Sequence, residues 1–221
     1  MRPHPALSLF LFTLAGCGAV PDSRPTQRAG QSTGASPVTV ARPEARQCFA
    51  ELGETGSRFA PLPDKYYGAG CSTVNSVRLE GVGGDRHQFT VTNLGAVACP
   101  LANSFAAWAR YGVDRAAQQI LGSPLQRIET MGSYSCRNVA GTGRRSAHSR
   151  GEAIDVAAFV LEDGRRVSVR SGWNASARER EFLRVIHRSA CKRFGTVLGP
   201  DYNRAHEDHF HLEYGSSSFC R

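Results

Sequence analysis

The sequence is poor in lysine: nearly all of its 27 cationic residues are arginines, set against 19 acidic residues. It has no basic run interleaved with aromatic residues, so we expect no nucleic-acid partner. When the residues before Cys48 are set aside, 22 cations and 17 acids remain, and the net charge falls from +8 to about +5. A moderately basic domain suits an anionic surface, such as a cell-wall polymer or lipid head groups.

The sequence also lacks an apolar run of about 20 residues, the length that a transmembrane helix needs. The apolar stretch from Ala6 to Ala15 follows Arg2 and leads into LAGC, which resembles a bacterial lipobox ending at Cys17. We therefore predict a lipoprotein signal peptide over residues 1–16 and a lipid anchor on Cys17. The predicted location is the periplasmic face of a cell-envelope membrane. An ordinary secretory signal that happens to contain a cysteine is the alternative.

Large apolar side chains are almost absent from residues 18–47, which are rich in Pro, Gly, Ser, Thr and Arg. Such a segment cannot bury enough surface to fold, so we predict a disordered, lipid-anchored linker over residues 17–47. Residues 48–221 are long enough for a single domain with a substantial core.

No two cysteines have C-x-x-C spacing, which weakens the case for a closed zinc site made of four cysteines. Six cysteines follow Cys17, and an even number in an exported chain predicts three disulfides. Their pairing stays open, because spacing alone does not choose among the combinations. The predicted disulfide cysteines are Cys48, Cys71, Cys99, Cys136, Cys191 and Cys220.

Internal repeats are absent as well, and the expected elements show no βαβ alternation. Alternating β-branched residues predict strands, and apolar residues three or four apart predict helices. Strands are predicted over residues 72–82, 87–97, 124–136, 196–199 and 209–214, with a strand hairpin over residues 151–169. Helices are predicted over residues 100–121 and 178–195, ended by Gly122 and Gly195, the second after a capping box of Ser176 and Glu179. We therefore expect an α+β domain with a central, mainly antiparallel sheet flanked by helices.

The first half of a predicted metal site is SAHSRGEAIDVAAF, residues 146–159, which contains His148 and Asp155. On one continuous helix these residues would stand about 10 Å apart along the axis, too far for ligands of one ion. Gly151 between them lets a loop fold back, so that a His nitrogen and an Asp oxygen converge. A surface-loop histidine and an aspartate that caps a turn are the alternative.

The second half is HEDHFH, residues 206–211. On a strand, His209 and His211 share one face, while Phe210, Leu212 and Tyr214 point into the core. One imidazole can bind metal while the other hydrogen-bonds or transfers a proton. The two halves together predict a zinc ion held by three ligands, with a fourth position open as in catalytic sites. The predicted ligands are His148, Asp155 and His211.

The stretch SAHSRGEAID fills every place of the S-x-H-x-x-G-x-A-x-D signature of D-Ala-D-Ala carboxypeptidases and dipeptidases. These belong to a zinc peptidase group that includes lysostaphin-type endopeptidases and the hedgehog fold. More closely, the chain resembles the bacterial extensin-like C-terminal family from roughly Cys48 to Cys220. The matching stretches are CPLANSFAAW, GSYSCR, SAHSRGEAIDVAAF, ACKRFGTVLGPDYN and HEDHFHLEY. The resemblance implies a disulfide-stapled, hedgehog/D-Ala-D-Ala peptidase-like fold, one zinc ion, and peptidase chemistry on peptidoglycan peptides.

The resemblance also suggests roles for residues around the ligands. The D-Ala-D-Ala peptidases usually carry E-x-x-H, whose Glu is the general base; here Asp208, one methylene shorter, takes that place. His209 and His206 are rival proton carriers. Arg137 resembles the arginine that holds a substrate carboxylate or the oxyanion, although a surface arginine beside a disulfide is the alternative. Ser146 is expected to orient the loop or a ligand, since the chain has no G-x-S-x-G motif.

Two other functions fit the same sequence. A non-catalytic, zinc-containing module that binds or supports the cell wall would also use a basic domain and a membrane tether. A disulfide-stapled domain without any metal would require both motifs to be coincidental.

Overall fold

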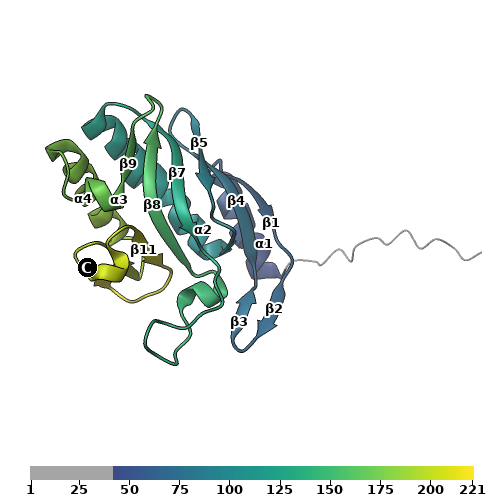
Figure 1. Cartoon of the computed structure of the whole chain (residues 1–221). Helices are drawn as coiled ribbons and strands as arrows, with labels where there is room; N and C mark the ends of the chain where they lie inside the picture. The colour runs from purple at the N-terminus through teal and green to yellow at the C-terminus, as the bar shows by residue number, and fades with distance from the viewer. Residues whose placement is uncertain (1–41) are drawn as a thin grey trace, which may run out of the picture. The chain divides into compact units, whose positions relative to one another are not determined.

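The computed structural model describes residues 42–221 (Figure 1). The predicted signal peptide, Cys17 and residues 18–41 of the predicted linker lie outside this range. Within the range, none of the helices is long and apolar enough to cross a membrane.

The first described helix, α1 (Pro43–Glu54), begins inside the segment that the sequence predicts to be a linker. Proline suits the first turn of a helix, where its missing N–H is not needed. Ala45 and Leu52 are buried in the core. A disulfide between Cys48 and Cys99 also joins α1 to the helix α2 (Cys99–Trp108). The predicted domain boundary at Cys48 therefore falls inside a packed helix, and the linker prediction is wrong for its last residues.

A large, mainly antiparallel sheet forms the centre of the domain, in the order β1-β4-β5-β7-β8-β11-β10-β12. Two short strands lie outside this order: β6 pairs with β4, and β9 pairs with β8. Strands β2 and β3 form a separate hairpin. The main strands are β1 (Arg58–Pro61), β4 (Ser76–Gly83), β5 (Gln88–Thr92), β7 (Leu125–Gly132), β8 (Ala153–Leu161), β10 (Thr196–Leu198), β11 (Phe210–Glu213) and β12 (Phe219–Cys220). The others are β2 (Lys65–Gly68), β3 (Cys71–Thr73), β6 (Ala96–Ala98) and β9 (Arg166–Ser168). The predicted α+β class is confirmed.

The predicted hairpins β4–β5 and β8–β9 are both present and antiparallel. The sheet nevertheless contains a parallel neighbour pair, β5 and β7. The chain between these strands runs through β6 and the long helical segment that starts with α2, and this crossover returns it in the same direction. The expectation that no βαβ connection occurs was therefore wrong at this place.

Helices cover one face of the sheet, with α1 and α2 behind it in the view of Figure 1. After α2 the chain continues in π-helical turns, η1 (Ala109–Asp114) and η2 (Ala117–Leu121). This helical segment ends at Gly122, whose φ is +78°. Two further helices follow, α3 (Val169–Gly172) and α4 (Ala177–Ala190). In the core, the Trp108 indole of α2 contacts both α4 and β8. It donates a hydrogen bond to the Ile186 carbonyl of α4 and packs edge-on against Phe159 of β8.

The start of α4 follows the sequence prediction, because the Ser176 hydroxyl accepts a hydrogen bond from the Glu179 N–H. Its end does not, since the helix stops at Ala190 and Gly195 is not its cap. Gly195 instead lies against the backbone of Gly215, and a Cβ built at residue 195 would come within 2.7 Å of it. The glycine is needed for close approach of two chain segments.

Three disulfides join the six predicted cysteines: Cys48–Cys99, Cys71–Cys136 and Cys191–Cys220. His187 lies close to the third pair. Because both sulfurs of that pair are already bonded to each other, this group is not a metal site.

We expect Gly195→Ala to lower the free energy of unfolding by about 1–3 kcal/mol, because the methyl group meets backbone that cannot rotate away. The matched control is Gly53→Ala in α1, where an added Cβ meets nothing within 4 Å. That change should leave the stability equal or raise it by up to about 1 kcal/mol, as helix propensity predicts. Urea unfolding of both variants measures the contrast, and equal effects would contradict the packing described for Gly195.

Candidate metal centre

Asp155 and His211 are brought together by the pairing of β8 with β11. The register of these antiparallel strands places the two residues directly opposite each other. Opposed side chains share one face of a sheet, and His211 Nδ1 lies 2.8 Å from Asp155 Oδ1. Phe210 and Leu212 point the other way and are fully buried, as predicted. Tyr214 was predicted to be in the core but is 51% exposed, because it lies beyond the end of β11.

His148 reaches the same place from a 3₁₀ turn, η3 (Ala147–Arg150). The Ser146 hydroxyl accepts a hydrogen bond from the His148 N–H at 3.3 Å and so begins the turn. Gly151 ends the turn with a φ of +66°, a conformation that favours glycine. An added Cβ at this glycine would also come within 3.2 Å of the Ala96 carbonyl oxygen. The loop therefore folds back toward β8, as the sequence predicts.

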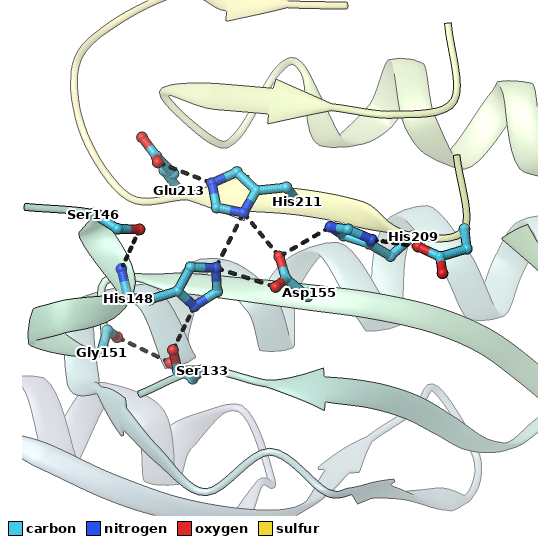
Figure 2. A network of polar contacts seen from close by, with 9 residues as sticks. Ser133, Ser146, His148, Gly151, Asp155, His209, His211 and Glu213 are labelled. Carbon is cyan, nitrogen blue, oxygen red and sulfur yellow. Dashed lines mark hydrogen bonds and ion pairs between the residues drawn. The ribbon is translucent and has the colours of Figure 1, made fainter. Parts of the chain in front are cut away.

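Three ligand atoms converge in a triangle (Figure 2). His148 Nε2 lies 3.2 Å from Asp155 Oδ2 and 3.2 Å from His211 Nδ1. His211 Nδ1 lies 2.8 Å from the other oxygen of the same carboxylate, Asp155 Oδ1. Around a tetrahedral zinc ion with bonds of about 2.0–2.1 Å, ligand atoms lie roughly 3.3 Å apart. These three residues, which we call the ligand triangle, therefore fit one ion of that size with only small movements.

Hydrogen bonds to groups outside the ligand triangle determine which ring nitrogen of each histidine faces it. His148 Nδ1 donates a hydrogen bond to the Ser133 carbonyl, which leaves Nε2 for a metal. His211 Nε2 donates to the Glu213 carboxylate at 2.9 Å, which leaves Nδ1. Such outer partners fix the orientation of metal-binding histidines. Neither partner was predicted from the sequence, although Glu213 lies two residues after His211 and hence on the same face of β11.

In the metal-free site, a proton on the His211 ring offsets the negative charge of the neighbouring carboxylates. Burial lowers the pKa of His211, but its hydrogen bonds with Asp155 and Glu213 outweigh burial and raise the pKa to about 9. Burial disfavours the charged form of Asp155 and so raises its pKa. Hydrogen bonds with His148 and His211 outweigh burial and hold the pKa of Asp155 well below its usual range. At neutral pH, His211 is therefore an imidazolium between two carboxylates.

His209 lies just before β11, on the same face as His211. Its Nδ1 donates to Asp208 Oδ1 at 2.8 Å, so that Nε2 faces Asp155 Oδ1 at 3.5 Å. Asp208 lies behind His209, in the turn before the strand. Of the predicted proton carriers, His209 thus directs a ring nitrogen at the ligand triangle (Figure 2). Asp208 holds the other ring nitrogen of His209 through a hydrogen bond.

His206 lies at the rim of the site, beside His209. His206 belongs to the 3₁₀ turn η4 (Arg204–His206), and its ring centroid is 5.2 Å from that of His209. Burial lowers the pKa of His206 to about 4, and the charges of His209, His211 and Arg137 act in the same direction. The His206 ring is therefore neutral at physiological pH, and Arg137 is close enough for its charge to act on that ring.

The fold and the site together define an α+β domain with a buried His-Asp-His cluster at one end of its sheet. The chain belongs to the family described as extensin-like protein C-terminus, which it matches over residues 46–221. No curated protein and no solved structure matches it.

Glu213→Gln should raise the zinc dissociation constant about 10–100-fold, because a neutral amide is a weaker partner for His211 Nε2–H than a carboxylate. The matched control is Glu181→Gln on the exposed side of α4, which should leave the affinity unchanged. Competition with a zinc-binding dye measures both constants. Equal affinity in Glu213→Gln and the parent protein would show that Glu213 does not support the site.

Zinc affinity should rise about tenfold for each pH unit between roughly pH 7 and 8.5. The sign follows from His211: its pKa of about 9 in the metal-free protein means that a metal must displace a proton from Nδ1 throughout this interval. Calorimetry at pH 7.5 in buffers of different ionisation enthalpy should show release of about one proton per ion. Zinc binding without proton release would contradict the protonated bridge.

Proposed function

We propose that this protein is an exported zinc-dependent peptidase that acts on peptidoglycan stem peptides at the periplasmic face of a cell-envelope membrane. The observation that carries the proposal is the ligand triangle, with the Asp208–His209 pair beside it. Three protein ligands leave a fourth position for water or substrate, as in catalytic zinc sites. His148, Asp155 and His211 would hold the ion.

A zinc ion at this place would supply a Lewis acid that lowers the pKa of a water molecule and polarises a peptide carbonyl. His209 then acts as the general base: its Nε2 takes a proton from the attacking water and later returns it to the leaving amine. Asp208 keeps the Nδ1 proton in place, so that Nε2 is the nitrogen that accepts. The role of Asp208 is therefore to orient the base.

Arg137 would bind a substrate carboxylate or the developing oxyanion, for which a guanidinium offers paired donors. Its charge reaches His206 at the rim of the site, which supports this role. The three disulfides support an exported location, because such bonds persist in oxidising compartments. The lipid anchor on Cys17 is part of the same proposal.

The proposal is tested with the purified chain, prepared without a His tag and loaded with zinc. His148→Ala should lose zinc and activity but keep its circular dichroism spectrum. His209→Ala should keep zinc and lose about 10²–10⁴-fold in rate, the usual contribution of a general base. His206→Ala, which leaves the triangle and His209 in place, should lose much less. Chromatography of muropeptides before and after digestion measures activity and identifies the bond cleaved.

Muropeptides left unchanged by the zinc-loaded parent protein would refute the peptidase. Binding to sacculi under the same conditions would then favour the non-catalytic wall-binding module. Full activity in His148→Ala would show that the ligand triangle is not the reactive site.

A further inference from the structure

The segment of the chain that leads into the site carries positive charges and no negative ones. Between Glu129 and Glu152 the chain carries four arginines and no acidic residue. Three of them belong to residues 137–145, which we call the arginine loop. This loop runs directly into η3, the turn that carries His148, and projects beyond the end of the sheet in Figure 1. The proposed function uses only Arg137 of these arginines.

The arginine loop folds back on itself as a narrow antiparallel ribbon. Asn138 and Arg145 form a bridge, flanked by hydrogen bonds from the Val139 N–H to the Arg144 carbonyl and from the Ser146 N–H to the Arg137 carbonyl. Opposed residues on such a ribbon lie on the same side, and successive residues alternate. One side therefore carries Arg137, Val139, Arg144 and Ser146, and the other carries Asn138 and Arg145.

The contacts of Arg145 agree with this division. Its guanidinium donates to Asn138 Oδ1 at 2.9 Å and to the Ala69 carbonyl at 2.6 Å, toward the β2–β3 hairpin. The disulfide from Cys71 to Cys136 joins the same hairpin to the base of the loop. This side of the ribbon is therefore fixed to the protein.

The side of the ribbon that carries Arg144 is linked to the turn that bears His148. Ser146 belongs to it, and its hydroxyl accepts the hydrogen bond from the His148 N–H. Arg137 belongs to it as well, opposite Ser146 on the ribbon. Both Arg137 and Arg144 are exposed, and neither forms an ion pair with an acidic residue among residues 42–221. Arg150, the fourth arginine of the stretch, pairs with Glu152.

We propose that Arg144 is a specificity-determining residue that binds, together with Arg137, a carboxylate of the peptide substrate, so that the site selects acidic peptides. The proposal rests on the proposed function. Arg137 and Arg144 are diagonal neighbours on one side of the ribbon, about 7–8 Å apart, a separation that two long side chains can close around one anionic group. Planar guanidinium groups match a carboxylate with paired hydrogen bonds.

The test compares two synthetic peptides of equal length, a stem pentapeptide with free carboxylates and the same peptide with all carboxylates amidated. Arg144→Gln should lower kcat/KM on the acidic peptide about fivefold, the effect of an exposed ion pair, and leave the amidated peptide unaffected. Arg144→Lys, which keeps the charge but not the paired donors, should fall between. Raising the ionic strength should reduce the preference of the parent protein for the acidic peptide.

Arg86→Gln is the matched control, since it also removes one exposed arginine that forms no ion pair within residues 42–221. Arg86 lies in the β4–β5 turn, at the Leu125 end of β7, whereas the site lies at the Gly132 end. It should change kcat/KM on neither peptide. An equal loss on both peptides in Arg144→Gln, or no difference from Arg86→Gln, would overturn the proposal.

A failure of the proposed function has a different signature, because the zinc-loaded parent protein then cleaves neither peptide. The affinities of the two peptides, measured by calorimetry, decide the role of Arg144 in that case. Tighter binding of the acidic peptide, lost in Arg144→Gln and kept in Arg86→Gln, supports anion recognition by the arginine loop. If the acidic and the amidated peptide bind with equal affinity in all three proteins, anion recognition by the arginine loop is rejected.

Discussion

The pairing of β8 with β11 is the constraint on which the candidate site depends. The register of this pair sets Asp155 opposite His211 and points both side chains away from the core. A shift by one residue would turn His211 toward the core and bring Phe210 to the site face. The buried side chains of Phe210 and Leu212 oppose that shift, so the hydrophobic core and the metal centre are specified by the same few residues.

The elements that depend on local chemistry could be predicted from the sequence. Ser176 caps α4 through a contact within its own first turn, and Gly122 ends its helix in a left-handed conformation. The convergence of His148, Asp155 and His211 also followed from local patterns, because a glycine after His148 and an alternating strand around His211 restrict where these side chains lie. The fold class followed from strand and helix patterns that are mixed without a βαβ alternation.

Features that depend on distant contacts could not be predicted. The role of Gly195 is set by Gly215, and the ring orientation of His148 is set by the Ser133 carbonyl, which any residue type could supply. Which of Asp208 and His209 faces the ligand triangle depends on where β11 begins, and the local sequence pattern does not fix that starting residue. The early start of α1 depends on a buried face and a disulfide to α2.

The hydrogen bonds around His211 also bear on how the protein matures. In the absence of metal, the ring carries a proton and links Asp155 to Glu213, so the strands that bear these residues are already held in register. Small zinc domains fold only around their ion, whereas in this structure a protonated His211 lies between two carboxylates, one of which the proposed ion would share. If zinc is the cofactor, as we propose, folding and disulfide formation would not require it, and the ion would enter later by exchange for a single proton.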